Sequence, residues 1–177
     1  GWIVFDVLVS AETMRAAWQL FQEHRSEGLP VSAVVYSHNH GDHWGGIRGI
    51  LTDEDATSGR VPVIAPVGFM ENAISENVFA GNAMNRRLFY QYGILLPTSP
   101  YGYVTQGLGP RVSAGSTGLI APTRLVTGAI EEFEVDGIPM VFQNTPNTEA
   151  PSEMNTWIPG YKTCLLYTSD AADEEDS

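Results

Sequence analysis

A run of β-branched residues, followed at once by a histidine-rich loop, constrains this chain more than any other stretch. Residues 31–36 read Val-Ser-Ala-Val-Val-Tyr, which predicts a buried strand. Residues 37–43 read Ser-His-Asn-His-Gly-Asp-His and contain three of the four histidines of the chain. Loops at the carboxyl ends of strands in α/β sheets are where ligands and catalysis concentrate. The pattern therefore predicts an α/β fold with a functional site on this loop.

The spacing of these residues has a chemical meaning. His38 and His40 are two apart, so on an extended segment both imidazoles can face one metal ion. Asp42 and His43 follow a glycine and can face a second ion. Mixed imidazole and carboxylate ligands suit zinc, and also manganese or iron. The simpler interpretation is a polar loop that caps a strand or helix; it suits a lone histidine better than four ligand-type residues followed by Gly-Gly.

The motif His-x-His-x-Asp-His at residues 38–43 resembles the signature of the metallo-β-lactamase superfamily. That resemblance implies an αββα sandwich that holds one or two metal ions and catalyses hydrolysis.

The residues before the motif predict a βαβ unit that delivers the histidine loop. Residues 2–8 are expected to form a strand, and a helix begins after Ser10 as its N-cap and ends near residues 28–30. Asp6 lies near the end of the first strand. It is either an ordinary acid at a strand end or, as the superfamily resemblance implies, a residue that orients a metal-binding histidine.

The rest of the chain is expected to alternate short strands, helices and loops. We predict a glycine-rich turn into a short helix (45–49), a polar loop (51–60), a strand (61–65), a mainly helical stretch (68–92), a long loop (97–118), strands (119–122 and 124–130) and a hairpin (131–135 and 138–144) turned by Asp136-Gly137. Arg86 and Arg87 lie in the helical stretch. They are either solvated or, as guanidinium groups that match sulfate, candidate substrate-binding residues.

Glu149 becomes a candidate because histidine is missing downstream. A typical superfamily member completes its first metal site with a third histidine, but no histidine follows His43. Glu149 follows a predicted strand on a loop between prolines, where a ligand would be expected. It could equally be a surface acid, in which case the site is incomplete.

Longer motifs narrow the resemblance. Residues 63–66 (Val-Ile-Ala-Pro), 75–78 (Ser-Glu-Asn-Val), 80–84 (Ala-Gly-Asn-Ala-Met), 118–123 and 142–146 are similar to those of the alkylsulfatase branch, over about residues 1–162. That branch consists of dizinc hydrolases of alkyl sulfate esters, in which metal-activated water attacks the ester. Its metal-site glutamate carries over to Glu149. Asn147 departs from the glycine usual at that position, but asparagine tolerates left-handed backbone better than most residues.

The resemblance assigns a role to each member of the motif. His38, His40 and Glu149 would hold one zinc ion, and Asp42 and His43 would help to hold the other. Asp42 is also the catalytic candidate. Two alternatives stay open: another hydrolase of this fold, such as a lactonase or thioesterase, or a non-catalytic metal-binding module. A diiron redox protein is less favoured, because those proteins usually carry glutamate where this chain has His40.

Composition limits the partners and the domain organisation. The formal net charge of −12 argues against nucleic acid as a partner, and no apolar run approaches a membrane span. The single cysteine excludes a disulfide framework. We expect a small-molecule alkyl sulfate as substrate, while the resemblance implies a homodimer for the full-length parent; the compartment is left open.

The carboxyl-terminal residues depart from the resemblance. Residues 164–177 resemble the translation of a sequencing adapter, so we predict a partial catalytic domain at 1–163 and a non-native acidic tail at 164–177. The chain also starts in mid-strand without methionine. We therefore expect the 177-residue chain to be an incomplete sandwich, with at most one well-formed zinc site and little or no activity by itself.

Overall fold

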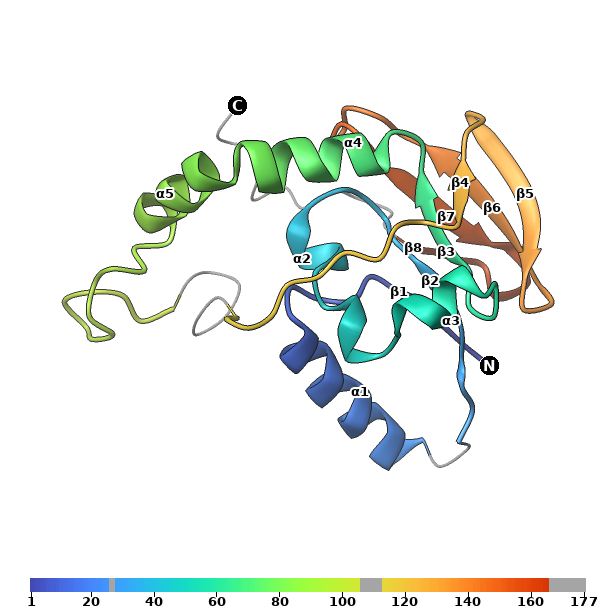
Figure 1. The fold of residues 1–177 in the computed structure, drawn as a ribbon, viewed down its shortest axis with the longest axis horizontal. Coiled ribbons are helices and arrows are strands. Elements are labelled where there is room, and N and C mark those ends of the chain that lie inside the picture. Colours follow the sequence, from blue (N-terminus) through green and yellow to red (C-terminus); the bar gives the residue numbers. More distant parts are fainter. Residues whose placement is uncertain (26–27, 106–112, 166–177) are drawn as a thin grey trace.

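Two four-stranded sheets form the centre of the fold, which is a computed structural model that describes residues 1–25, 28–105 and 113–165. In the first sheet the strands lie in the order β1-β2-β3-β4 and are all parallel. In the second sheet they lie in the order β5-β6-β7-β8 and are antiparallel. The helices α1 to α4 lie on the side of the first sheet that faces away from the second (Figure 1).

Strands alternate with helical segments as far as β4, and β5, β6 and β7 then follow without a helix between them. The first sheet contains β1 (Trp2–Phe5), β2 (Val31–Val35), β3 (Val63–Pro66) and β4 (Arg124–Val126). The second contains β5 (Ile130–Val135), β6 (Ile138–Asn144), β7 (Met154–Ile158) and β8 (Thr163–Leu165). The helical segments are α1 (Ala11–His24), α2 (Gly41–Trp44), η1 (Ile47–Gly49), α3 (Asp53–Thr57), α4 (Phe69–Ile74), the π-helix η2 (Ser75–Phe79), α5 (Gly81–Gln91) and η3 (Pro159–Tyr161).

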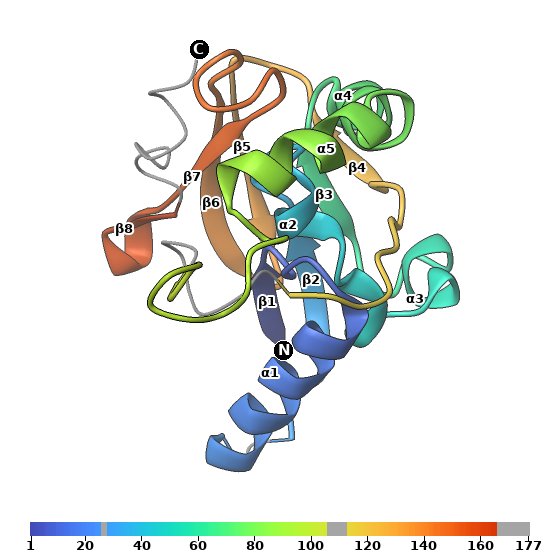
Figure 2. The same ribbon diagram turned by 90° about the vertical axis from the view of Figure 1, so that its left-hand side faces the viewer.

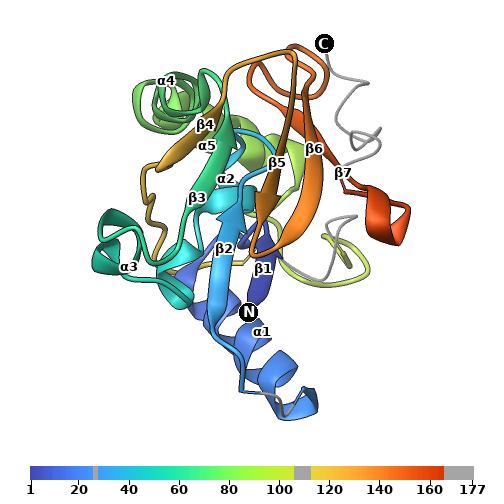
Figure 3. The same ribbon diagram turned by 90° about the vertical axis from the view of Figure 1, so that its right-hand side faces the viewer.

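The central strands of the first sheet, β2 and β3, are covered on both faces, as their apolar sequences predict. Alternate residues of a strand point to opposite faces, so Val34 contacts the helices while Ala33 and Val35 contact the second sheet. The layer between the sheets contains Ala33, Val35, Ile64, Val126, Val135, Met140, Phe142 and Met154. Figure 3 shows β5 and β6 packed beside β1 and β2. This arrangement confirms the predicted αβ layering of the superfamily fold.

The predicted βαβ unit is confirmed, with one correction. The Ser10 side chain accepts a hydrogen bond from the Thr13 backbone N–H, so it caps α1 as expected. The first strand, however, stops at Phe5 rather than Leu8. Asp6 and Leu8 have φ angles of 55° and 60°, so the chain leaves the extended conformation at Asp6.

Three predicted segments differ from the structure. Residues 51–60 are not a simple loop, because Thr52 and Asp55 form a capping box that starts α3. Residues 119–122 form no strand, and the predicted strand at 124–130 is two strands, β4 and β5, separated at 127–129. Ile120 is nevertheless buried, and its carbonyl accepts a hydrogen bond from the Tyr36 hydroxyl.

The helical stretch and the hairpin agree with the sequence prediction. Residues 69–91 are helical in three pieces, and α5 projects away from the sheets (Figure 1). The long loop at 97–118 is confirmed over its described residues, which contain no helix or strand. Asp136 and Gly137, with φ angles of 49° and 76°, form the tight turn between β5 and β6.

The end of the described chain bears on the predicted domain boundary. Cys164 and Leu165 belong to β8, which pairs with β7. The remaining residues of the predicted tail, 166–177, lie outside the described part of the chain, so the tail stays a prediction. In the described ranges there is no helix with both the length and the apolar content for crossing a lipid bilayer.

Candidate metal centre

The loop after β2 carries His38 and His40 to the edge of the sheet. His38 is fully buried, whereas a quarter of the His40 side chain is exposed, where it precedes α2. Figure 2 shows α2 beyond the end of β2, with α5 in front of it. The predicted position of the loop, at the carboxyl end of a strand in a parallel sheet, is therefore confirmed.

Glu149 meets these two histidines from the second sheet. Its Oε1 atom lies 3.4 Å from Nε2 of His38 and 3.6 Å from Nδ1 of His40. The two imidazole nitrogens lie 3.1 Å apart. Within the described residues, His38, His40 and Glu149 form the one group of three such side chains close enough to share a metal ion.

These distances fit a tetrahedral zinc site. Two ligand atoms that are each 2.0–2.1 Å from a tetrahedral ion are about 3.3 Å apart. The three separations of 3.1, 3.4 and 3.6 Å lie around that value. Two imidazoles and one carboxylate are also a donor set that zinc accepts, with one position left open. The residues present therefore fit a zinc ion without large movement.

Asp6 orients two of the histidines through hydrogen bonds. Its carboxylate accepts from the Ser37 backbone N–H (2.8 Å), the Ser37 hydroxyl (2.7 Å) and Nδ1–H of His43 (2.8 Å). Because the Ser37 hydroxyl gives its proton to Asp6, its oxygen accepts from Nδ1–H of His38, 2.9 Å away. Both histidines then keep their Nε2 lone pairs for a cation. These contacts are compatible with the second interpretation of Asp6, which stays a proposal.

Asp42 and His43 stand beside the first group as a separate pair. The Asp42 Oδ2 atom lies 3.5 Å from Nε2 of His43, and the His43 ring is stacked obliquely 4.0 Å from the His38 ring. The Asp42 side chain is two-thirds exposed. The two residues are thus placed together, as predicted, but they supply only two ligands for a second ion.

The charges around the site change the pKa values of two histidines. The hydrogen bond to Glu149 is the main reason why the pKa of His40 is raised, against the opposing effect of burial. Burial lowers the pKa of His43, but the hydrogen bond to Asp6 and the charges of Asp6, Asp42 and Glu149 outweigh it, so the net pKa is raised. Without a cation, both rings therefore hold a proton more tightly than a free imidazole does.

The loop that carries Glu149 has two features that bring its carboxylate inward. Asn147 has a φ angle of 62°, so the position needs the left-handed conformation that glycine or asparagine adopts. The buried Glu153 carboxylate accepts from the Thr148 hydroxyl (2.7 Å) and from the backbone N–H groups of Glu149 (2.8 Å) and Ala150 (3.1 Å). Glu153 therefore closes the loop that presents Glu149.

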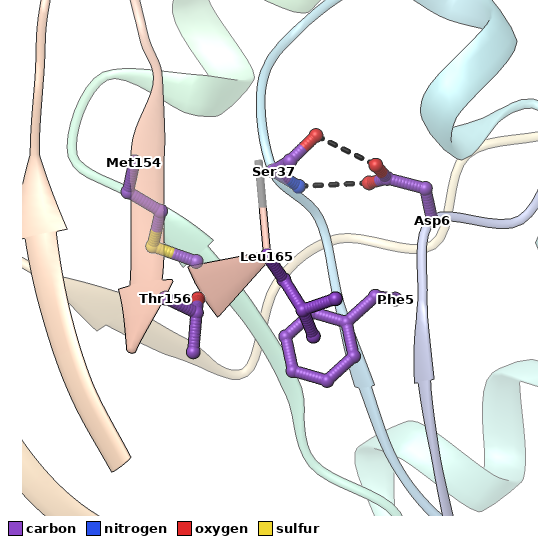
Figure 4. A pocket seen from close by; sticks show the side chains of 6 residues that line it. All are labelled: Phe5, Asp6, Ser37, Met154, Thr156 and Leu165. Carbon is purple, nitrogen blue, oxygen red and sulfur yellow. Dashed lines mark hydrogen bonds between the residues drawn. The ribbon is translucent and has the colours of Figure 1, made fainter. Parts of the chain in front are cut away.

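Backbone pairing joins the two ligand loops. His38 and Glu153 form an isolated antiparallel bridge, and the Met154 N–H donates to the Ser37 carbonyl at 2.9 Å. A pocket of about 220 Å³ lies beside this junction, between Asp6 and Ser37 on one side and Met154 and Thr156 on the other (Figure 4). None of its lining residues is His38, His40 or Glu149.

Sequence reasoning missed Glu153 and Glu76. Glu153 lay in the predicted loop and was given no role. In the structure it is buried just before β7, and a buried carboxylate needs hydrogen-bond donors around it. Glu76 accepts a hydrogen bond from the Asn39 amide and approaches His40. Arg86 and Arg87 are exposed on α5, and Arg86 donates to the Asn82 carbonyl, so their substrate role stays a proposal.

The sequence of this chain is similar to those of known metallo-β-lactamase-superfamily proteins. A sequence profile of the metallo-β-lactamase superfamily matches residues 1–172. An alkyl/aryl-sulfatase, BDS1, from Saccharomyces cerevisiae is 46% identical over 157 residues, which are 89% of this chain and 24% of that protein. An (R)-specific secondary-alkylsulfatase from a Pseudomonas species is 45% identical over 97% of this chain and 26% of its own length.

A solved structure gives the same result for the fold. The stereoselective inverting sec-alkylsulfatase Pisa1 from a Pseudomonas species is 44% identical, with a TM-score of 0.86 over 92% of this chain and 26% of that chain. The chain thus spans about a quarter of the length of these relatives. Since the profile covers nearly the whole sequence and the fold and histidine motif agree with it, the chain belongs to the metallo-β-lactamase superfamily.

Proposed function

We propose that this chain is part of a zinc-dependent alkylsulfatase that hydrolyses alkyl sulfate esters to an alcohol and sulfate. The observation that carries the proposal is the convergence of Nε2 of His38, Nδ1 of His40 and Oε1 of Glu149. A carboxylate occupies the place where the superfamily usually has a third histidine. The similarity to two alkylsulfatases at 45–46% identity supports the substrate class.

His38, His40 and Glu149 would hold the first zinc ion, and Asp42 and His43 would contribute to the second. Bound zinc would supply a water of lowered pKa and a positive charge near the sulfate. Asp6 fixes the ring orientation of His43 directly and that of His38 through Ser37. Asp42, exposed beside His43, would accept a hydrogen bond from the attacking water and hold it toward the ester.

The proposal separates binding from catalysis in this chain. The 177-residue chain should bind zinc at the three-donor site but hydrolyse dodecyl sulfate poorly, because Asp42 and His43 alone are too few ligands for the second ion. The longer parent protein should hydrolyse dodecyl sulfate. We also propose that the parent is a homodimer and that Arg86 and Arg87 contribute positive charge near the substrate.

Two measurements test the proposal. Zinc binding to the 177-residue chain is measured by competition with a chromophoric chelator, with Glu132→Gln, on the exposed face of β5, as control for Glu149→Gln. Sulfate release from dodecyl sulfate is measured for the parent, beside a lactone and a thioester. We expect Glu149→Gln to lose zinc binding and Glu132→Gln to keep it. Lactone or thioester hydrolysis without sulfate release would contradict the substrate class.

A further inference from the structure

Asn39, which lies between the two metal-site histidines, uses both ends of its buried amide. Its Nδ2 atom donates to Oε2 of Glu76 at 2.8 Å, and its Oδ1 atom accepts from the Ser152 backbone N–H at 3.1 Å. Because a backbone N–H can only donate, Oδ1 must face Ser152 and Nδ2 must face Glu76. Asn39 therefore connects three segments: the histidine loop, the π-helix η2 and the loop of Glu149.

The second oxygen of Glu76 faces His40. Oε1 lies 3.7 Å from Nε2 of His40, within ion-pair distance, while Nδ1 of the same ring faces Glu149. For Nδ1 to offer a lone pair to a cation, the neutral ring must carry its proton on Nε2. A carboxylate opposite Nε2 favours that tautomer, as acceptors behind metal-bound histidines commonly do. η2 is a π-helix, a form that often occurs at functional sites.

We infer that Asn39 and Glu76 are a positioning pair that sets the orientation and tautomer of His40 and fixes the Glu149 loop at the distance a cation needs. This inference rests on the proposed zinc site. The Asn39 amide holds the Glu76 carboxylate opposite His40. At its other end it holds Ser152, whose hydroxyl donates to the Val67 carbonyl at 2.7 Å. Histidine loop, η2 and Glu149 loop are thus aligned by one side chain.

The hydrogen-bond directions allow a sharp test by exchange of the two functional groups. Asn39→Asp places a carboxylate against the Glu76 carboxylate, and Glu76→Gln places an amide N–H₂ against a donor, either Asn39 or His40. In the double variant the new carboxylate accepts from Ser152 and from the new amide. The amide oxygen can still accept from His40. The net charge of the double variant equals that of the original protein.

Zinc affinity of the 177-residue chain is measured by chelator competition, and the His40 tautomer by ¹⁵N NMR of the metal-free protein. Each single variant is expected to bind zinc about 10–100-fold more weakly, the range seen when partners of metal-bound histidines are lost. The double variant is expected to bind more tightly than either single variant. The exposed Glu71 and Asn85 provide matched controls, Glu71→Gln and Asn85→Asp, which should bind as the original chain does.

Three results would overturn the inference. If the fold-losses in zinc affinity of the two single variants multiply in the double variant, the two groups act separately. Asn39→Asp binding zinc as tightly as the original chain would show that the pair has no positioning role; if that variant does not fold, unchanged affinity in Glu76→Gln decides the same question. A chain that binds no zinc at all would overturn the proposed function as well, which distinguishes the two failures.

Discussion

Replacing Asp6 by asparagine should reverse the proton positions on two histidines. Asp6 accepts three hydrogen bonds, two from Ser37 and one from His43. The new amide oxygen can satisfy the Ser37 N–H, but the amide nitrogen would then face the Ser37 hydroxyl and Nδ1 of His43. Nδ1 of His43 would have to become an acceptor. The Ser37 hydroxyl would turn and donate to Nδ1 of His38, so both Nε2 atoms would carry protons.

The expected size of the effect follows from the bonds lost. A hydrogen bond to a charged group contributes about 1.5–3 kcal/mol, and 1.4 kcal/mol is a factor of about ten in affinity. His38 loses its free lone pair through the loss of one such bond, between Ser37 and Asp6. Zinc affinity at the His38, His40 and Glu149 site should therefore fall about 10–100-fold. His43 should also lose its raised pKa, since Asp6 is the main group that raises it.

The assay combines chelator competition with ¹⁵N NMR of the histidine rings. Asp6→Asn introduces no backbone strain, because asparagine accepts the left-handed conformation of this position. Asp136→Asn is the matched control: the same substitution at a φ angle of 49°, in the β5–β6 turn. Unchanged zinc affinity in Asp6→Asn, or His38 and His43 rings still protonated on Nδ1, would refute the reasoning.

Three further outcomes are expected. Zinc at about 100 times its Kd should stabilise the chain against urea by about 2.7 kcal/mol, and Glu149→Gln should abolish the gain; equal gains in both proteins would contradict the site. Glu153→Ala should destabilise the metal-free chain by about 2–6 kcal/mol, because the N–H groups of Glu149 and Ala150 lose their acceptor at about 1–3 kcal/mol each; an unchanged urea midpoint would argue against it. The raised pKa values of His40 and His43 mean that the folded state binds these protons more tightly than the unfolded state. Their contribution to the stability of the metal-free chain is therefore complete below about pH 6.5 and lost as pH rises through the folded pKa values; urea midpoints that rise from pH 6 to 8 would contradict this.

The sequence predicted those parts of the site that depend on local pattern. The β-branched run and the histidine spacing placed His38 and His40 correctly, because strand, turn and ligand spacing are all set within ten residues. Glu149 needed the resemblance, since its approach to His38 depends on the packing of two sheets. Asn147 was flagged by its departure from glycine, and its left-handed backbone explains why that position is restricted.

The parts that failed depend on side-chain hydrogen bonds that composition and hydrophobic pattern do not show. Thr52 and Asp55 looked like polar loop residues, although their spacing satisfies a capping box. Glu153 was given no role, because composition does not show that three donors of its own loop surround it. Asp6 ended β1 three residues early, since its hydrogen bonds to the next strand require a turn of the backbone.

Because His38 and Glu153 form a backbone bridge, substitutions near the site and insertions or deletions near it should have different effects. Main-chain hydrogen bonds join the two loops, so a substitution nearby can change how a donor side chain is oriented but leaves this pairing in place. An insertion or deletion between residues 144 and 153 would instead slip the pairing by one position and turn Glu149 away from His38. The interval from 144 to 153 is therefore expected to keep its length among relatives that share this metal centre.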